Sequence, residues 1–315
     1  MTWRRIGLMV GPVLAFGVSA LVAGHVPASA DPFDVCLPAP PRHTPAMERD
    51  VAIETPDGKI AGTLARPADA EPRALVVLLH GYTGSRNEIR VAKGEGMFAR
   101  TARAFAERGI ATLRIDFIGS WASDGEWADT TFSTQARDAV RAAVAMRDDF
   151  GFKAVPLGVL GYSQGGLVAL RAAAQSASFD RIALWNPVMD PMATYGIIFG
   201  RDKILQAAER HDPQGPGEIV DGTRLRPGFF AEIVTADPIA DAAAVTAPVL
   251  IVTGQRDPLV RNGAALAAEL ATPRTAETMI LDLDAGHDLG AFRNPELLDK
   301  VITCTAGFLL GAKVR

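Results

Sequence analysis

The sequence predicts an α/β protein built on a mostly parallel central sheet with helices on both faces. Short apolar runs alternate with longer segments of helical spacing from about residue 51 to the C-terminus, and such alternation favours a parallel sheet. Several runs are continuously apolar, as strands buried on both faces are. In addition, the motif Gly-Tyr-Ser-Gln-Gly at residues 161–165 stands between such a run and a helical pattern of small residues.

The expected elements follow from local patterns. A Pro-Asp-Gly turn signal at residues 56–58 predicts a hairpin, and apolar positions at helical spacing closed by Gly109 predict the first long helix. The expected strands are 51–54, 60–64, 74–80, 111–117, 155–160, 180–185, 247–254 and 278–283, and the expected helices are 97–108, 131–150, 166–174 and 294–311.

The alternation of strands and helices is broken between residues 187 and 246, a stretch far longer than an ordinary connection. This stretch follows the sixth strand and emerges at the edge of the sheet that carries the serine motif, so we interpret it as a cap. Its methionine and aromatic residues fit either the wall of a substrate pocket or the contact between the cap and the body.

Ser163 is the candidate nucleophile. Between a strand and a helix, Gly-x-Ser-x-Gly forms a sharp turn that strains the serine backbone and exposes its hydroxyl, and the flanking glycines avoid collisions that a Cβ would make. The same pattern arises by chance in glycine-rich chains, so the interpretation depends on the strand–turn–helix context. A serine hydroxyl also needs a base to take its proton and a carboxylate to hold that base.

Asp257 and His287 are the candidate acid and base, and they follow Ser163 in that order. Each comes directly after a predicted strand, and α/β proteins place catalytic groups at the carboxyl ends of their strands. The alternative for His287 is an ordinary histidine of a surface loop. The alternatives for the acid, which are close to His287 in sequence but lack the loop position of Asp257, are Asp282, Asp284 and Asp288.

Two backbone N–H groups are expected to bind the negative charge that develops in the reaction. One belongs to Gln164, at the N-terminus of the helix after the serine. The other belongs to Tyr82, in the loop His-Gly-Tyr-Thr-Gly that follows the strand at 74–80. Loss of one such donor typically costs ~10²–10³ in rate. We interpret His80 as structural, with its ring under this loop and hydrogen-bonded to the backbone.

The composition is that of a globular protein, with 315 residues of which 48% are hydrophobic and 22% charged. The net charge of −4 and the lack of a basic run argue against nucleic acid as a partner. No Cys or His cluster has zinc spacing, and neither a dinucleotide-binding glycine motif after a strand nor a Walker motif is present. We therefore expect a small-molecule substrate, no cofactor and no metal.

Residues 1–30 have the parts of a secretory signal peptide. Arg4 and Arg5 precede an uncharged apolar run at 6–24, and Ala-Ser-Ala at 28–30 is a cleavage signal. The alternative is an uncleaved anchor, because the run approaches the ~20 residues that span a bilayer. We expect cleavage, a periplasmic or secreted protein without membrane contact, and a Pro-rich arm at 31–50 before a single domain at 51–315.

Cys36 and Cys304 are the two cysteines of the sequence. Export permits a disulfide. Cys36 lies in the Pro-rich arm, which cannot form a core of its own, whereas Cys304 lies in an apolar C-terminal helix. We predict that they pair and fasten the arm to that helix; the alternative is one buried thiol and one free thiol.

From about residue 51 onward the sequence resembles the α/β-hydrolase superfamily. Within it, the stretches that resemble bacterial cinnamoyl (feruloyl) esterases are residues 79–88, 94–98, 114–119 and 123–126. This resemblance implies the α/β-hydrolase fold with a small cap after the sixth strand, and a serine esterase acting on esters of hydroxycinnamic acids. By position it assigns the nucleophile, acid and base to Ser163, Asp257 and His287, and the oxyanion donors to Tyr82 and Gln164. That family usually has a glycine where Trp121 stands.

These features predict an exported serine carboxylesterase that forms an acyl-enzyme, with hydroxycinnamoyl esters among the expected substrates. Other functions stay open. A serine peptidase of the prolyl-oligopeptidase type would normally need an N-terminal propeller or an acidic pair that captures the substrate amine. An acyltransferase differs only in the nucleophile that receives the acyl group. A non-catalytic binding protein of this fold would commonly lack a member of the triad.

Overall fold

The computed structural model describes residues 31–36, 41, 45–92, 94–152, 155–176, 178–210, 212–220 and 223–311. The predicted signal peptide at residues 1–30 and most of the proline-rich run at 37–44 lie outside the described residues. The chain divides into two units, Met1–Asp31 and Pro32–Arg315, and the fold given below is that of the second unit. In the described part of the chain, no helix is both long and apolar enough to cross a membrane.

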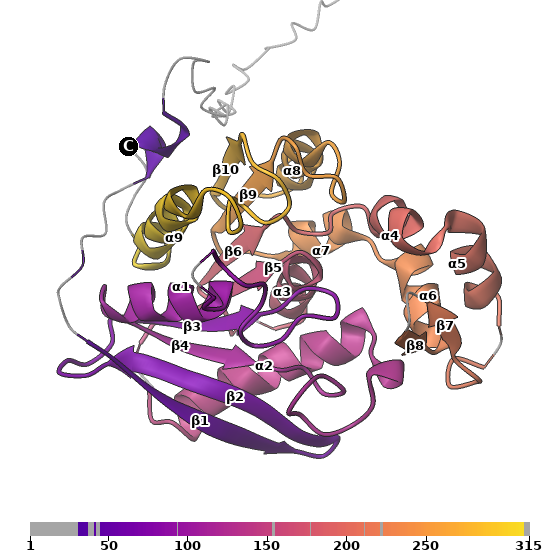
Figure 1. Ribbon diagram of the computed structural model, residues 1–315, viewed down its shortest axis with the longest axis horizontal. Coiled ribbons are helices and arrows are strands. Elements are labelled where there is room, and N and C mark those ends of the chain that lie inside the picture. Colours follow the sequence, from indigo (N-terminus) through magenta and orange to yellow (C-terminus); the bar gives the residue numbers. More distant parts are fainter. Residues whose placement is uncertain are drawn as a thin grey trace, which may run out of the picture. The chain divides into compact units, whose positions relative to one another are not determined.

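The central sheet has the order β1-β2-β4-β3-β5-β6-β9-β10 among the described residues (Figure 1). Strand β2 is antiparallel to both β1 and β4, and every other neighbouring pair is parallel. The strands are β1 (Ala46–Thr55), β2 (Gly58–Pro67), β3 (Ala74–Leu79), β4 (Ile110–Ile115), β5 (Leu157–Tyr162), β6 (Arg181–Trp185), β9 (Val249–Gly254) and β10 (Thr278–Leu283). The predicted mostly parallel sheet is confirmed.

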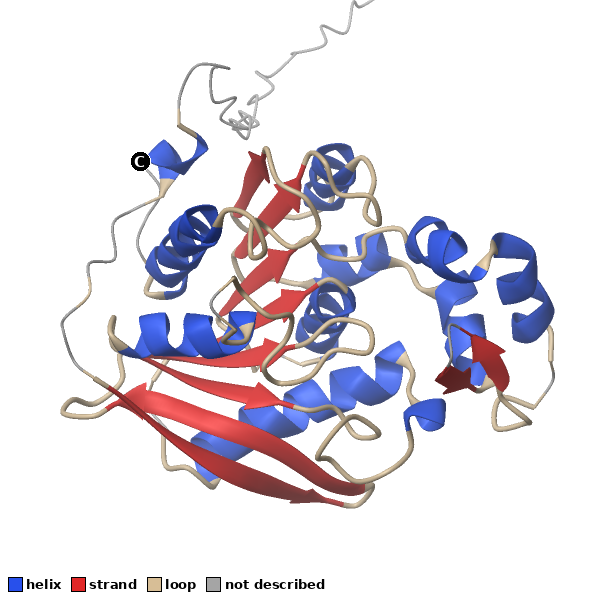
Figure 2. Cartoon of the chain, viewed as in Figure 1, coloured by secondary structure: helices blue, strands red, loops and turns tan. Residues whose placement is uncertain are grey.

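Helices cover both faces of the sheet (Figure 2). Strand β3 explains the continuous apolar pattern: Leu75, Val77 and Leu79 point into one hydrophobic core, whereas Val76 and Leu78 point into the other. The first core is closed by α2 (Phe132–Asp148), α3 (Gln164–Gln175), α7 (Pro238–Ala244) and α8 (Gly263–Ala271), and the second by α1 (Met97–Ala106) and α9 (Pro295–Leu309). Because both faces are covered, the parallel strands β3, β5 and β9 are buried along their whole length.

The first strand begins before the expected domain boundary at residue 51. Strand β1 starts at Ala46 and pairs with β2 along its whole length, from Ala46 opposite Pro67 to Thr55 opposite Gly58. Most side chains of β1 are exposed or half-buried, because it is an edge strand with one free side. Glu48, Arg49 and Asp50, near its start, are polar, so the sequence pattern does not separate the beginning of this strand from the arm.

The long insertion after β6 consists of short helices and a small hairpin, whose elements α4, α5, α6, β7 and β8 lie together beside one end of the sheet (Figure 1). They are α4 (Pro191–Phe199), α5 (Arg201–Ala208), β7 (Glu218–Val220), β8 (Thr223–Leu225) and α6 (Pro227–Thr235). Asp190 caps α4 by accepting a hydrogen bond from the Ala193 N–H at 2.9 Å, and proline follows that cap at the first helical position, where its fixed φ suits a helix.

The aromatic residues of the insertion pack it onto the body of the protein. Tyr195 and Phe229 are buried and contact the ring of Phe132 on α2, with ring centroids 5.8 and 5.3 Å apart. Phe199 and Phe230 join the same cluster. For these side chains, the second of the two interpretations holds, namely contact between the cap and the body.

Cys36 and Cys304 form the predicted disulfide, with their Cα atoms 5.0 Å apart. Cys36 follows the short 3-10 helix Pro32–Val35, and Cys304 is a buried residue of α9. The bond joins residues 268 positions apart in the sequence, so it closes a long loop and restricts the unfolded chain strongly.

Replacing Cys36 and Cys304 together by alanine is expected to lower the free energy of unfolding by about 3–5 kcal/mol. The measurement is unfolding by guanidinium chloride under oxidising conditions, followed by circular dichroism. Wild-type protein treated with a thiol reductant is the control, and it should unfold at the same lower denaturant concentration as the double variant. Equal unfolding midpoints for the oxidised wild type and the double variant would contradict the prediction.

Candidate active site

Ser163 occupies a strained turn between β5 and α3. Its backbone has φ 54° and ψ −119°, a left-handed conformation that residues with a Cβ rarely adopt. The turn is held by hydrogen bonds on both sides: the Ser163 N–H donates to the Trp185 carbonyl at 2.9 Å, and the Ser163 carbonyl accepts from the N–H groups of Gly166 and Val188 at 2.9 and 3.1 Å. The surrounding structure therefore fixes a conformation that the residue alone would avoid.

The glycines around Ser163 are required by close packing. A Cβ on Gly161 would lie 2.0 Å from the carbonyl oxygen of Gly165, and one on Gly165 would lie 2.1 Å from the carbonyl oxygen of Leu79 in β3. A Cβ on Gly166 would meet Pro187 at 2.6 Å. These contacts are the collisions with the neighbouring strand and helix that the sequence motif predicts.

The predicted nucleophile, base and acid lie in one series of hydrogen bonds. His287 Nε2 is 3.0 Å from Ser163 Oγ, and His287 Nδ1 is 2.6 Å from Asp257 Oδ2. The other carboxylate oxygen of Asp257 accepts the N–H groups of Leu259 and Val260 at 2.8 and 2.9 Å. Because a carboxylate only accepts hydrogen bonds, the ring proton is on Nδ1, which leaves Nε2 to accept the serine hydroxyl.

The other acids near His287 in the sequence contact different groups. Asp282 accepts the hydroxyl of Thr253 at 2.7 Å, and Asp284 forms an ion pair with Arg256 at 2.9 Å. Asp288 accepts the N–H of Phe292 at 2.9 Å. Of the acids considered, Asp257 is therefore the one that the structure brings to the histidine.

Tyr162 and Asn186 position the loop of His287, and the sequence analysis did not assign either of them to the site. The Tyr162 hydroxyl donates to the carbonyl of His287 at 3.0 Å, and its ring lies 5.1 Å from the imidazole. The Asn186 side-chain amide donates to the same carbonyl at 2.8 Å and accepts the N–H of Gly254 at 2.7 Å. Their positions in the sequence could have indicated this role, because both residues stand at the carboxyl ends of strands beside Ser163.

The loop after β3 passes close to the serine and is held at the carbonyl of Gly81. A Cβ on Gly81 would lie 3.3 Å from Ser163 Cβ. The Gly81 carbonyl accepts the Gly84 N–H at 3.0 Å and the Nδ1 proton of His80 at 2.8 Å. In a trans peptide the C=O and the following N–H point in opposite directions, so these two bonds also set the direction of the Tyr82 N–H, the predicted oxyanion donor.

His80 is a buried, neutral ring under this loop. Its Nε2 accepts the N–H of Phe117 at 3.3 Å, which assigns the ring proton to Nδ1. Burial lowers the pKa of His80 to about 4, although the bond to the Gly81 carbonyl opposes the shift. The ring is therefore uncharged near pH 7, and its contacts are those of the structural histidine that the sequence predicts.

Gln164, the second predicted oxyanion donor, begins α3, where backbone N–H groups have no acceptor within the helix. Its side chain belongs to a buried hydrogen-bonded series that crosses three segments. The Tyr195 hydroxyl of α4 donates to Gln164 Oε1, Gln164 Nε2 donates to Gln135 at 2.8 Å, and Gln135 donates to the Thr130 hydroxyl at 2.9 Å. The insertion is thus bonded directly to Gln164, the residue that follows Ser163.

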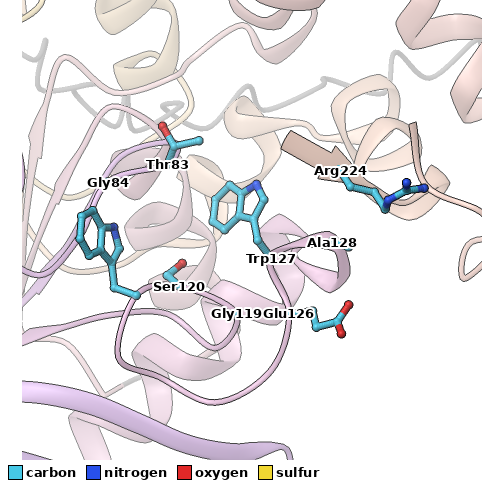
Figure 3. Close-up of a pocket in the computed structure, with 9 residues that line it drawn as sticks. Thr83, Gly84, Gly119, Ser120, Glu126, Trp127, Ala128 and Arg224 are labelled. Carbon is cyan, nitrogen blue, oxygen red and sulfur yellow. The ribbon is translucent and has the colours of Figure 1, made fainter. Parts of the chain in front are cut away.

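A cavity of about 500 Å³ opens beside the loop of Tyr82 (Figure 3). Thr83, Trp127 and Arg224, from different segments of the chain, lie around it. Trp121 also lines the cavity, is 77% exposed and has φ 45°, a backbone conformation that glycine adopts without strain. The described residues contain no group of three or more His, Cys, Asp or Glu side chains that could hold a metal ion.

Residues 70–214 match the family described as serine aminopeptidase, S33. Among solved structures, the chain is similar to Est1E from Butyrivibrio proteoclasticus with ferulic acid bound, with a TM-score of 0.64 and 22% identity over 83% of this chain and 98% of that one. It is also similar to the esterase Pf2001 of Pyrococcus furiosus, with a TM-score of 0.60 and 20% identity over 84% of this chain and 92% of that one.

The chain has the α/β-hydrolase fold. Peptidases are among its structural neighbours as well: an acylaminoacyl peptidase of Pyrococcus horikoshii aligns with a TM-score of 0.64 and 17% identity, over 87% of this chain and 42% of the peptidase. No curated protein sequence matches the chain. The family model covers a little under half of the chain, and esterases and peptidases are both represented among the structural neighbours.

Proposed function

We propose that the protein is an exported serine carboxylesterase that hydrolyses carboxylic esters through an acyl-enzyme. The observation that carries this proposal is the continuous series from Ser163 through His287 to Asp257, with distances of 3.0 and 2.6 Å. Such a series converts a weak nucleophile into an active one, because the histidine takes the serine proton and the carboxylate stabilises the imidazolium that forms.

In the proposed reaction, Ser163 Oγ attacks the ester carbonyl while His287 Nε2 takes its proton. The carbonyl oxygen becomes negatively charged and is bound by the N–H groups of Tyr82 and Gln164. His287 then gives the proton to the leaving alcohol, and an ester bond joins the acyl group to Ser163. Water repeats the sequence with His287 as base, which releases the acid and restores the serine.

Hydroxycinnamoyl groups are the proposed acyl groups. The likeness to Est1E, whose structure holds ferulic acid, supports this choice. The cavity beside the Tyr82 loop is lined by Trp121 and Trp127, but Ser163, His287 and Asp257 are not among its lining residues. Export is supported by the pattern of residues 1–30 and by the disulfide, since stable disulfides form in oxidising compartments.

The second candidate function is a serine peptidase, favoured by the family description and by the acylaminoacyl peptidase neighbour. An ester and an amide react through the same tetrahedral intermediate, so the triad alone serves both. The experiment must therefore compare the two bonds directly.

The test is hydrolysis of a p-nitrophenyl ester series and methyl ferulate, beside aminoacyl p-nitroanilides, by the chain without residues 1–30. We expect turnover of the esters, with methyl ferulate above the aliphatic esters. Turnover of the anilides alone would replace the esterase by a peptidase. Transfer of the acyl group to added alcohol in preference to water would indicate an acyltransferase, and lack of turnover on every substrate would favour a non-catalytic role.

A further inference from the structure

The Glu88 carboxylate turns back under the loop that carries the Tyr82 N–H. Its Oε2 atom accepts the N–H of Gly81 at 2.7 Å. It also packs against the other end of the loop, because a Cβ on Gly84 would lie 2.8 Å from the same oxygen. The second glycine of the His-Gly-Tyr-Thr-Gly sequence is thus explained by the space that this carboxylate needs.

The backbone around Glu88 is built to direct this side chain inward. Glu88 has φ 58°, in the left-handed region, and its N–H donates to the Ser85 carbonyl at 2.8 Å. The preceding Asn87 carbonyl accepts the Phe98 N–H at 3.1 Å, and a Cβ on Gly96 would lie 2.2 Å from that carbonyl oxygen. A strained conformation that neighbouring segments hold in place points to a role for the side chain.

Glu88 is half-buried, and its carboxyl group lies under the loop without a cationic partner. Among the ion pairs of the described residues, none includes Glu88. Burial raises its pKa to about 7, while hydrogen bonds from the N–H groups of Gly81 and Ile89 oppose the rise. Partial burial of a carboxylate costs free energy that a glutamate fully in water would not lose. The groups that compensate for this cost here are the backbone N–H groups of the loop.

Gly81 is therefore held at both of its backbone polar groups. Glu88 accepts its N–H, and the Gly84 N–H and the His80 ring donate to its carbonyl. These bonds fix the peptide planes on both sides of Gly81. The Tyr82 N–H shares its plane with the Gly81 carbonyl, so its direction is fixed too. We propose that Glu88 is a positioning residue that aims the Tyr82 N–H at the oxyanion, an inference that rests on the proposed esterase function.

The test compares Glu88→Ala and Glu88→Gln with Glu95→Ala, the matched control. Glu95 follows on the same connection to α1 and pairs with Arg100 and Arg103 at 2.7 and 2.8 Å, without contacting Gly81. For each protein, kcat and KM are measured on p-nitrophenyl butyrate. Inhibition constants are measured for an alkyl trifluoromethyl ketone, which adds to the serine and forms an oxyanion, and for butyrate, which does not.

For Glu88→Ala we expect kcat to fall by about 10- to 100-fold, which is no more than the fall in rate when an oxyanion donor is removed altogether. KM should stay within about 3-fold of wild type, because binding of the substrate in the ground state is kept. The inhibition constant of the ketone should rise by a similar factor, and that of butyrate should not change. Glu88→Gln keeps an acceptor for the Gly81 N–H and should recover most of the rate. Glu95→Ala should resemble wild type.

Unchanged kcat in Glu88→Ala, an equal loss in Glu95→Ala, or an unchanged inhibition constant of the ketone would overturn the inference. Should Glu88→Ala not fold, Glu88→Asp takes its place, because its side chain is one methylene shorter and withdraws the carboxylate from the Gly81 N–H. Ester hydrolysis that is lost in Ser163→Ala but unchanged in Glu88→Ala would overturn this inference and leave the proposed function standing. Lack of ester turnover by the wild type would overturn the proposed function and this inference with it.

Discussion

Replacement of Ser163 by alanine is expected to lower kcat for ester hydrolysis by roughly 10⁶-fold. Alanine removes the one oxygen that can form the acyl bond, and His287 is left without a proton to take. The fold should not change, because serine and alanine both carry a Cβ and meet the same strain at φ 54°. The measurement is the initial rate on p-nitrophenyl butyrate, together with labelling by a fluorophosphonate followed by intact mass.

Ser178→Ala, on the connection between α3 and β6, is the matched control, and it should keep the wild-type rate and the label. The prediction fails if Ser163→Ala retains more than about 1% of the wild-type rate, or if it still takes up the fluorophosphonate. Either result would place the nucleophile on another residue, and the hydrogen-bonded series at Ser163 would then lack a chemical role.

Replacement of Asp257 by asparagine is expected to lower kcat by roughly 10⁴-fold. The backbone of this structure gives the reason. One oxygen of Asp257 is held by the N–H groups of Leu259 and Val260, so the amide oxygen of asparagine would occupy that position and its NH₂ would face His287. A donor at that point requires Nδ1 to accept, which moves the ring proton to Nε2 and removes the acceptor for the serine hydroxyl.

Asp282→Asn and Asp288→Asn are the controls for this second prediction, because they change neighbouring acids that do not contact the ring. Their kcat values on the same ester should stay within about 3-fold of wild type. A large loss of kcat in Asp288→Asn, with a small loss in Asp257→Asn, would show that Asp288 is the acid. That result would contradict the prediction.

The positions of Ser163, Asp257 and His287 could be predicted because each depends on a short local pattern. A buried apolar run marks a strand, and parallel strands bring their carboxyl ends to one edge of the sheet. Ser163, Asp257 and His287 each follow such a run, so their meeting in space needs no knowledge of the side chains between them. The glycines at 161 and 165 follow equally from the sharp turn.

The supporting residues could not be predicted in the same way. Tyr162 and Asn186 bond to the backbone of a loop that is more than 100 residues away in the sequence. Glu88 is only seven residues from Gly81, but no spacing rule connects a glutamate side chain to that backbone N–H. The start of β1 at Ala46 could not be predicted for another reason. The first residues of this edge strand are mostly exposed, so they lack the regular alternation of apolar residues that indicates a strand. Likewise, aromatic composition alone did not separate a packed cap from an open pocket.

The buried bond from Tyr195 to Gln164 has a consequence for how this protein can evolve. In many enzymes, a mobile cover can be exchanged to recognise new molecules while the chemical machinery stays constant. Here the insertion shares a buried hydrogen bond with Gln164, the residue after Ser163, and a buried polar group that loses its partner is costly. Under the proposed function, a substitution of Tyr195 in α4 would therefore disturb the site as well as the insertion.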